Sequence, residues 1–204
     1  MTALRKTPVA LPPNAASFAI RGERSSDVVA REALLDACFG ANRHTRTCQR
    51  LRDGRTPAEG LALSAVARGK LVGTLRLWHV SVGGNPALML GPLAVNAGSR
   101  KSGVGAALME QALMIAKQRG HGAVILLGDA PYYARFGFSD RKTGELSLPG
   151  PFERDRLLGL ELRAGALDGA WGMIAATCSR LPRILHKAKA SRTKKVLQAV
   201  PHAA

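Results

Sequence analysis

The sequence predicts an α/β fold with a mixed, mostly antiparallel sheet, one parallel strand pair and helices on both faces. The first observation is a strand–helix–strand unit. Residues 87–95 are almost wholly apolar, residues 104–119 carry apolar side chains at helical spacing, and residues 123–127 form a second apolar run. A crossover of this length joins parallel strands of one sheet, so we expect 87–95 and 123–127 to run parallel.

The second observation is a series of antiparallel strands before this unit. Residues 61–67 and 71–82 carry strand-like patterns on either side of a turn at Arg68-Gly69-Lys70, which predicts a hairpin. Gly83-Gly84-Asn85-Pro86 supplies the next turn, so residues 87–95 continue the series.

The remaining elements complete the two layers. We expect residues 15–24 to form the first strand, followed by a helix that Ser25-Ser26-Asp27 caps and Gly40 ends. The later segments are predicted as a short helix at 132–136, a strand at 157–162, and a closing loop with an edge strand at 165–173.

Composition indicates one domain with two extensions. The chain has 204 residues, of which 46% are hydrophobic, enough for a sizeable core. We predict a loose arm at 1–14 rather than a signal peptide, a domain at 15–178 and a basic tail at 179–204 that is dispensable for chemistry. No apolar run reaches the length of a membrane span.

The three cysteines, Cys38, Cys48 and Cys178, are an odd set without the spacing of a metal site. We interpret them as reduced thiols of a cytoplasmic protein and expect no bound metal. A catalytic role for one of them is the less favoured interpretation.

A formal net charge of +16 is the strongest compositional anomaly. It fits an acidic partner such as nucleic acid or an anionic membrane, a polyanionic ligand, or simply a solvated basic face. Aromatic residues make up only 4% and supply little for base stacking, so we favour the solvated face. The two basic clusters are Arg43, Arg46, Arg50, Arg52 and Arg55, and Arg180, Arg183, Lys187, Lys189, Arg192, Lys194 and Lys195.

The first of these clusters lies in a segment, roughly 41–60, that shows no strong period. We interpret this segment as a second short helix or as a loop beside a substrate entrance.

The loop before the helix at 104–119 has the features of a phosphate site. Gly103 and Gly105 remove side chains where a backbone must approach a ligand, and Arg100 and Lys101 add positive charge. The first N–H groups of a helix have no partner within it and lie at the positive end of its dipole. A pyrophosphate ligand is therefore expected at this loop. Just upstream, Gly91-Pro92 lies inside an apolar strand, where glycine and proline often mark a bulge or a lost ladder bond, with an ordinary kink as the alternative.

Two motifs in this order carry a family resemblance. Arg100-x-x-Gly103-x-Gly105 after one strand, and Tyr133-x-x-x-Gly137-Phe138 after the next, resemble the GNAT superfamily of acetyl-CoA-dependent N-acetyltransferases. The phrases Leu90-Gly-Pro-Leu-Ala-Val95 and Leu126-Leu-Gly-Asp-Ala-Pro-Tyr-Tyr-Ala-Arg-Phe-Gly-Phe138 are most similar to its YhbS-like bacterial subgroup. The resemblance covers roughly residues 17–175 in element order and is specific over 88–138.

The resemblance implies an enzyme that moves an acetyl or short acyl group from CoA to a primary amine by direct attack in a ternary complex. It implies a splayed parallel strand pair, with pantetheine in the split, and acetyl-CoA as cosubstrate. The residues that it implies for binding are Leu93, Ala94, Val95, Arg100, Lys101, Ser102, Gly103, Val104, Gly105, Ala106, Tyr133 and Phe136. Tyr133 takes the position of the general acid that protonates the leaving thiolate, whereas Tyr132 is expected to pack the short helix.

The general base is left open. Many members of the family carry a glutamate on the strand before the pyrophosphate loop, but this chain has Leu88-Met-Leu-Gly-Pro there. His79 and Asp129 are the two candidates, each with a structural alternative, and Glu32 is a remote third. Loss of the amine proton to water is a fourth alternative.

Two rival functions remain at this level. The missing carboxylate favours a non-catalytic CoA-binding sensor, which the retained Tyr133 opposes, and the charge suggests a nucleic-acid-associated protein. The expected acceptor is a small-molecule or peptide amine, with an acidic partner for the basic tail and a homodimer as further hypotheses.

Overall fold

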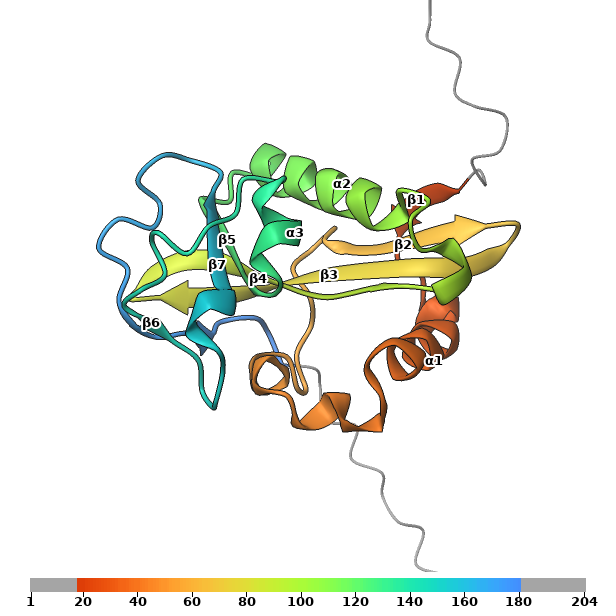
Figure 1. Ribbon diagram of the computed structural model, residues 1–204, viewed down its shortest axis with the longest axis horizontal. Helices are drawn as coiled ribbons and strands as arrows, with labels where there is room; N and C mark the ends of the chain where they lie inside the picture. Colours follow the sequence, from red (N-terminus) through yellow and green to blue (C-terminus); the bar gives the residue numbers. More distant parts are fainter. Residues whose placement is uncertain (1–17, 181–204) are drawn as a thin grey trace, which may run out of the picture.

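The computed structural model describes residues 18–180, which form a central sheet with helices on both faces (Figure 1). The helices α1 (Val28–Phe39) and α2 (Val104–Gln118) lie on opposite sides of this sheet, and α3 (Ala130–Ala134) lies on the side of α2. Seven strands make up the sheet, in the order β1-β2-β3-β4-β5-β7, with β9 paired to β3. The bounds are β1 (Ala19–Gly22), β2 (Ala62–Ala67), β3 (Lys70–Val82), β4 (Asn85–Val95), β5 (Ala123–Leu127), β7 (Leu157–Glu161) and β9 (Ala175–Ala176).

The predicted mixed sheet is confirmed. β1, β2, β3 and β4 are antiparallel in series, and β4 and β5 are the predicted parallel pair. β7 returns antiparallel to β5 over five residue pairs. The crossover from β4 to β5 runs through α2, as expected for a right-handed connection between parallel strands.

The parallel pair is split. β4 and β5 pair only at Leu88 with Val124 and at Met89 with Ile125, although β4 continues to Val95. After Leu90 the register between β3 and β4 shifts, so that Gly91 and Pro92 together lie opposite Arg76 alone. This is the bulge predicted from Gly91-Pro92, and Gly91 needs its φ of +133° there. A bulged strand bends, which is consistent with β4 leaving β5 at this point.

Alternating side chains divide the core between the two faces of the sheet. Leu77 and Leu88 face α2 and pack with its buried Leu108, whereas Trp78 and Met89 face the opposite side. Part of that opposite side is covered by α1, whose Leu34 and Leu35 pack on Ala94. The rest is covered by the C-terminal segment, including Ile174 and Cys178.

The first helix is anchored by buried ion pairs. Asp27 accepts hydrogen bonds from Arg21 at 2.6 Å and from the backbone N–H of Arg24, and it also accepts one from the buried hydroxyl of Ser64. These bonds hold the pKa of Asp27 well below its usual range, with the hydrogen bond from Arg21 as the largest cause. The helix ends as predicted at Gly40, whose φ is +76°.

Short elements fill the loops. Between α1 and β2 the arginine-rich segment forms two 3₁₀ helices, and single 3₁₀ turns precede α1, follow β4 and precede β7. In chain order these are η1 (Ser25–Asp27), η2 (Ala41–Thr45), η3 (Thr47–Leu51), η4 (Ala97–Ser99) and η5 (Arg154–Arg156). Within residues 18–180, none of the helices has the length and apolar character needed to cross a membrane.

Three predicted boundaries were wrong. The described part of the first strand covers only Ala19–Gly22, and the short helix predicted at 132–136 begins earlier because the carbonyl of Asp129 accepts the N–H groups of Tyr132 and Tyr133. The segment predicted as an edge strand at 165–173 contributes only β8 (Gly172–Met173), which pairs with β6 (Leu146–Ser147) in a separate two-stranded sheet. The main sheet instead receives β9.

The predicted arm at 1–14 and nearly all of the predicted tail at 179–204 lie outside the described residues. The first two tail residues are described and belong to the folded part. The carbonyl of Ser179 accepts a hydrogen bond of 2.9 Å from the backbone N–H of Thr56, and Arg180 forms a β-bridge with Arg55.

Candidate active site

The loop between β4 and α2 presents backbone N–H groups at a helix N-terminus. Asn96 accepts a hydrogen bond from the N–H of Gly98, and the hydroxyl of Ser102 donates to the carbonyl of Ser99 at 2.6 Å, which braces the loop. Lys101 and Gly103 have positive φ angles of 63° and 83°. No side chain caps α2, so its first N–H groups are free to bind a ligand, as the sequence predicted for a phosphate.

The two positions of this loop require glycine for different structural reasons. Gly103 is the N-cap of α2 in the left-handed region, and a Cβ there would meet no heavy atom within 4 Å. Gly105 lies in the first turn of α2, where a Cβ would stand 3.1 Å from the hydroxyl of Tyr132 and 3.6 Å from Cγ2 of Val95. Gly103 therefore sets the backbone, and Gly105 makes room for the second signature segment.

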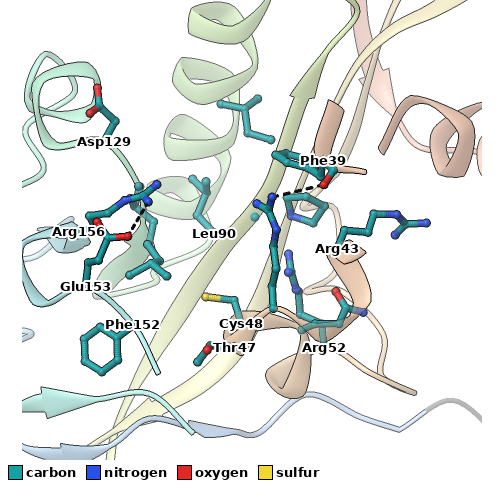
Figure 2. Close-up of a pocket in the computed structure, with 18 of the residues that line it drawn as sticks. Phe39, Arg43, Thr47, Cys48, Arg52, Leu90, Asp129, Phe152, Glu153 and Arg156 are labelled. Atoms are coloured by element: carbon teal, nitrogen blue, oxygen red, sulfur yellow. Dashed lines mark hydrogen bonds and ion pairs between the residues drawn. The ribbon is translucent and has the colours of Figure 1, made fainter. Parts of the chain in front are cut away.

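A cavity of about 780 Å³ opens at the split between β4 and β5. Its walls come from η2 and η3 on one side and from the segment before β7 on the other, with Leu90 of β4 between them (Figure 2). Leu93, Tyr132 and Tyr133 also line it, whereas Ala94, Val95, Phe136 and the loop residues 100–106 do not. The cavity and the phosphate-type loop thus meet at the two tyrosines, because the Tyr132 hydroxyl lies next to Gly105.

Tyr133 is positioned by close packing. Its ring lies edge-on to Phe138, with centroids 6.0 Å apart, and against the backbone of Gly128. Its hydroxyl makes no hydrogen bond within residues 18–180. Burial raises the pKa of Tyr133 to about 12, so the phenol stays protonated at neutral pH and retains a proton to donate.

Tyr132 and Phe136 are held together by an arginine. The guanidinium of Arg135 lies 4.0 Å from the centroid of the Tyr132 ring and 4.9 Å from that of Phe136. Tyr132 packs edge-on against Tyr133 at 4.9 Å. Phe136 packs on the α2-side core and does not reach the cavity.

The three candidate bases lie in different surroundings. Asp129 is exposed at the edge of the cavity, and its carboxylate has no hydrogen-bond partner in the described chain (Figure 2). His79 does not line the cavity: it lies on the α2 face of β3, with its ring 5.4 Å from that of His121. Glu32 is bound by Arg31 and Arg43, and these hydrogen bonds outweigh desolvation and lower its pKa, which weakens it as a base.

Several side chains that line the cavity were not among the predicted site residues. Phe39, Arg43, Arg46, Cys48, Arg52, Phe152, Glu153 and Arg156 are among them. The arginine-rich segment had been assigned only as a helix or a loop beside a substrate entrance. A signal was available: Arg46, Gln49 and Arg52 are three residues apart, the repeat of a 3₁₀ helix, and all three line the cavity beside η3.

Metal and thiol chemistry find little support in the described part of the chain. Residues 18–180 contain no group of three or more histidine, cysteine, aspartate or glutamate side chains that could hold a metal ion. All three cysteines are free thiols. Cys48 lines the cavity, but burial raises its pKa, with a smaller opposing effect from Arg52, so it is a thiol and not a thiolate at neutral pH.

The mixed sheet with its split parallel pair is the fold of a known family of acetyltransferases. The model of the Acetyltransferase (GNAT) family matches residues 29–138, and the chain belongs to this family.

The chain is similar to YhbS, an uncharacterized N-acetyltransferase of Escherichia coli (strain K12), with 28% identity over 157 residues that cover 76% of this chain and 93% of YhbS. The crystal structure of Escherichia coli YhbS in complex with CoA superposes with a TM-score of 0.69 at 27% identity and covers 82% of this chain and 93% of that one. A GNAT family acetyltransferase from Brucella melitensis, in complex with acetyl-CoA, shares the fold with a TM-score of 0.52 at 24% identity, over 75% of this chain and 99% of that one.

Proposed function

We propose that this protein is an acetyl-CoA-dependent N-acetyltransferase that transfers an acetyl or short acyl group to a primary amine. The split between β4 and β5, with the uncapped N-terminus of α2 at one end and Tyr133 at its mouth, is the observation that carries the proposal. The CoA and acetyl-CoA complexes of the two related proteins support this assignment of the donor.

The donor side suits a pyrophosphate and an extended thiol arm. Residues Arg100, Lys101, Ser102, Gly103, Val104, Gly105 and Ala106 would surround the pyrophosphate. The open N–H groups and positive dipole end of α2 favour an anion there, and both loop cations are exposed. Beyond Met89, β4 has β3 on one side only. Backbone groups of Leu93, Ala94 and Val95 on the other side would pair with the pantetheine arm as an added strand.

The chain's residues supply the proton transfers. The amine nitrogen attacks the thioester carbonyl carbon, the carbon–sulfur bond breaks, and an amide and a thiolate result. The nitrogen loses a proton to solvent water as the amide forms, while Tyr133 gives its phenolic proton to the departing sulfur and recovers one from solvent. Because burial disfavours the phenolate, Tyr133 holds this proton until negative charge develops nearby.

Asp129 is the favoured base in this proposal. It is the only one of His79, Asp129 and Glu32 that lines the cavity, and its carboxylate is free to accept a proton from the acceptor ammonium, directly or through water. Cys48 is a protonated thiol on the opposite wall (Figure 2). Both observations support direct attack by the amine and no acyl-cysteine intermediate.

The test is a turnover assay of the full chain with acetyl-CoA, a panel of amines, polyamines and peptides, and release of free CoA as readout. Amine-dependent CoA release, with the acetylated amine identified by mass spectrometry, is the expected result. Tight binding of acetyl-CoA by calorimetry, without turnover of any acceptor, would overturn the enzyme in favour of a CoA-binding sensor.

A further inference from the structure

One arginine of the cavity has a buried nitrogen without a hydrogen-bond partner in the described part of the chain. Within residues 18–180, Nε of Arg52 is the only buried side-chain nitrogen or oxygen without a hydrogen-bond partner. Arg52 also forms no ion pair in this part of the chain. Burial lowers the pKa of its guanidinium. The nearby Cys48 and Asp53 oppose this effect, and the like charges of Arg43 and Arg46 add to it, yet an arginine remains protonated in proteins.

Arg52 lies where β4 leaves β5. Its Nη1 is 3.5 Å from the position that a Cβ on Gly91 would take, beside the bulge that opens the split. Figure 2 shows Arg52 beside Cys48 and Arg43 on the η3 wall, opposite Arg156 and Glu153. An anionic group bound by Arg52 would therefore lie close to the proposed path of the reacting thioester.

The carboxylates near Arg52 are held by other side chains. Asp53 accepts a hydrogen bond from Gln49, and Glu32 is bound by Arg31 and Arg43. Asp53 and Glu32 therefore have other partners than Arg52.

The other cavity arginines differ in how well they are paired. Arg43 is saturated by Glu32 and Asp36, the latter at 2.6 Å, and Arg156 lies 3.4 Å from Glu153. Arg46 has no carboxylate partner in the described chain: it donates to the carbonyl of Phe39 at 3.4 Å, and its guanidinium lies over that ring at 5.1 Å. Arg46 and Arg52 are thus the two cations of this wall that a ligand can still neutralise.

We propose that the acceptor amine also carries a carboxylate or phosphate group, which Arg52 binds with help from Arg46. This inference rests on the proposed N-acetyltransferase function. Arg52 is half-buried, and leaving its buried Nε without a partner is costly in the free protein. A ligand anion reduces that cost by accepting charge-assisted hydrogen bonds from the guanidinium. An acceptor of this class is an amino acid, a peptide with a nearby acidic group or an amino phosphate.

The same arrangement helps the chemistry. Positive charges near the cavity disfavour the ammonium form of the acceptor and lower its pKa, so more of the amine is neutral and able to attack. The anionic group of the acceptor holds the molecule in place, and the Arg52 charge beside it lessens the need for a strong base. This agrees with the absence of a carboxylate at residues 88–92 of β4.

The activity test compares matched acceptors. Each amino acid is compared with its amino alcohol, and O-phosphoethanolamine is compared with ethanolamine. Every acceptor is assayed with wild type, Arg52→Met and Arg50→Met. Arg50 belongs to the same η3 helix, is exposed, does not line the cavity and donates a hydrogen bond of 2.7 Å to the carbonyl of Pro149, so its variant controls for the loss of one charge and one hydrogen bond outside the cavity. We expect Arg52→Met to raise KM for anionic acceptors roughly 10–100-fold and to leave neutral acceptors and acetyl-CoA affinity unchanged. Arg50→Met should behave as wild type.

A binding test does not need turnover. N-acetyl amino acids, which are carboxylate-bearing products, should raise the melting temperature of wild type and Arg50→Met but not that of Arg52→Met. N-acetylethanolamine, which has no charge, should leave the melting temperature of all three proteins unchanged. Without ligand, Arg52→Met should melt no lower than wild type, because it removes an uncompensated charge. A large drop in its melting temperature, with equal loss of activity on all acceptors, would make Arg52 a structural residue and overturn the inference.

Other outcomes separate the two proposals. Equal turnover of anionic and neutral amines overturns the inference and leaves the N-acetyltransferase function standing. An Arg52-dependent preference for succinyl-CoA over acetyl-CoA, with a neutral amine, would place the anion on the acyl group and overturn the acceptor class. Absence of turnover with every acceptor overturns the proposed function, and the melting test then decides whether the anion site exists.

Discussion

The ring of Tyr133 lies directly on the backbone of Gly128: a Cβ on residue 128 would stand 2.8 Å from Cδ2 of Tyr133 and nearer still to Cε2. Gly128 follows the last residue of β5, so the end of that strand serves as the seat for the proposed general acid. A side chain at 128 and the present position of Tyr133 exclude each other. This relationship explains why the chain needs glycine at a position whose φ is not in the left-handed region.

Gly128→Ala should therefore displace Tyr133. We expect a loss of about 1–3 kcal/mol in the free energy of unfolding, from overpacking, and a fall in turnover at least tenfold. Gly144→Ala is the matched control, because a Cβ there meets nothing within 4 Å and its backbone is not left-handed. Denaturant unfolding and CoA release measure the two effects; wild-type turnover in Gly128→Ala would show that the position of Tyr133 is unimportant.

Tyr133→Phe isolates the hydroxyl. The ring packing on Phe138 and Gly128 is kept, so stability and CoA affinity should barely change, while turnover falls by roughly two to four powers of ten. Tyr132→Phe should do less. Steady-state kinetics with calorimetry of CoA binding provides the measurement, and full turnover by Tyr133→Phe would mean that water protonates the thiolate.

The raised pKa of Tyr133 has a direct spectroscopic test. The chain contains two tyrosines, so Tyr132→Phe leaves Tyr133 as the sole phenol. Its ultraviolet phenolate signal should still appear clearly above pH 10, because burial is the largest cause of the raised pKa, with Tyr132 a smaller one. Because burial raises the pKa in the folded state, the stabilisation from the neutral phenol is complete below about pH 10 and is lost as pH rises toward 12. A midpoint near 10 in the folded variant would contradict the burial.

Gly103 and Gly120 provide a matched pair at the two ends of α2. Both have positive φ, 83° and 77°, and a Cβ on either meets nothing within 4 Å. Replacement by leucine should cost each variant a similar backbone strain of about 1 kcal/mol. Only Gly103→Leu places a side chain at the proposed pyrophosphate site, so calorimetry should show CoA affinity falling sharply in that variant alone. Equal affinity in the two variants would remove the phosphate assignment from this loop.

Asp129→Asn tests the favoured base against His79→Gln. The first should lower turnover about 10–100-fold at neutral pH, with partial recovery at higher pH as more acceptor amine is neutral. The second should leave turnover unchanged, because His79 does not line the cavity. A pH–rate profile for each variant with one good acceptor decides the matter, and the reverse order of effects would reassign the base to His79.

The sequence alone was sufficient for the elements whose signals are local. Apolar alternation around the Arg68-Gly69-Lys70 turn predicted the β2–β3 hairpin, helical spacing ending near Gly120 predicted α2, and Gly91-Pro92 predicted the bulge in β4. The parallel direction of β4 and β5 also followed, because a strand–helix–strand crossover of this length joins parallel strands of one sheet. These features depend on backbone preferences that each segment carries by itself.

Only the tertiary structure decided which distant groups meet. It brought η3 against the bulge at Gly91 and left Nε of Arg52 buried without a hydrogen-bond partner in residues 18–180. It also placed Asp129 at the cavity and His79 beside His121, away from the cavity. The contact of Arg52 with Gly91 and that of His79 with His121 each join residues more than thirty positions apart in the chain, so no local pattern reports them. The sequence could therefore indicate where the donor-binding loop lies, but the charge that an acceptor would meet became visible only once the chain was folded.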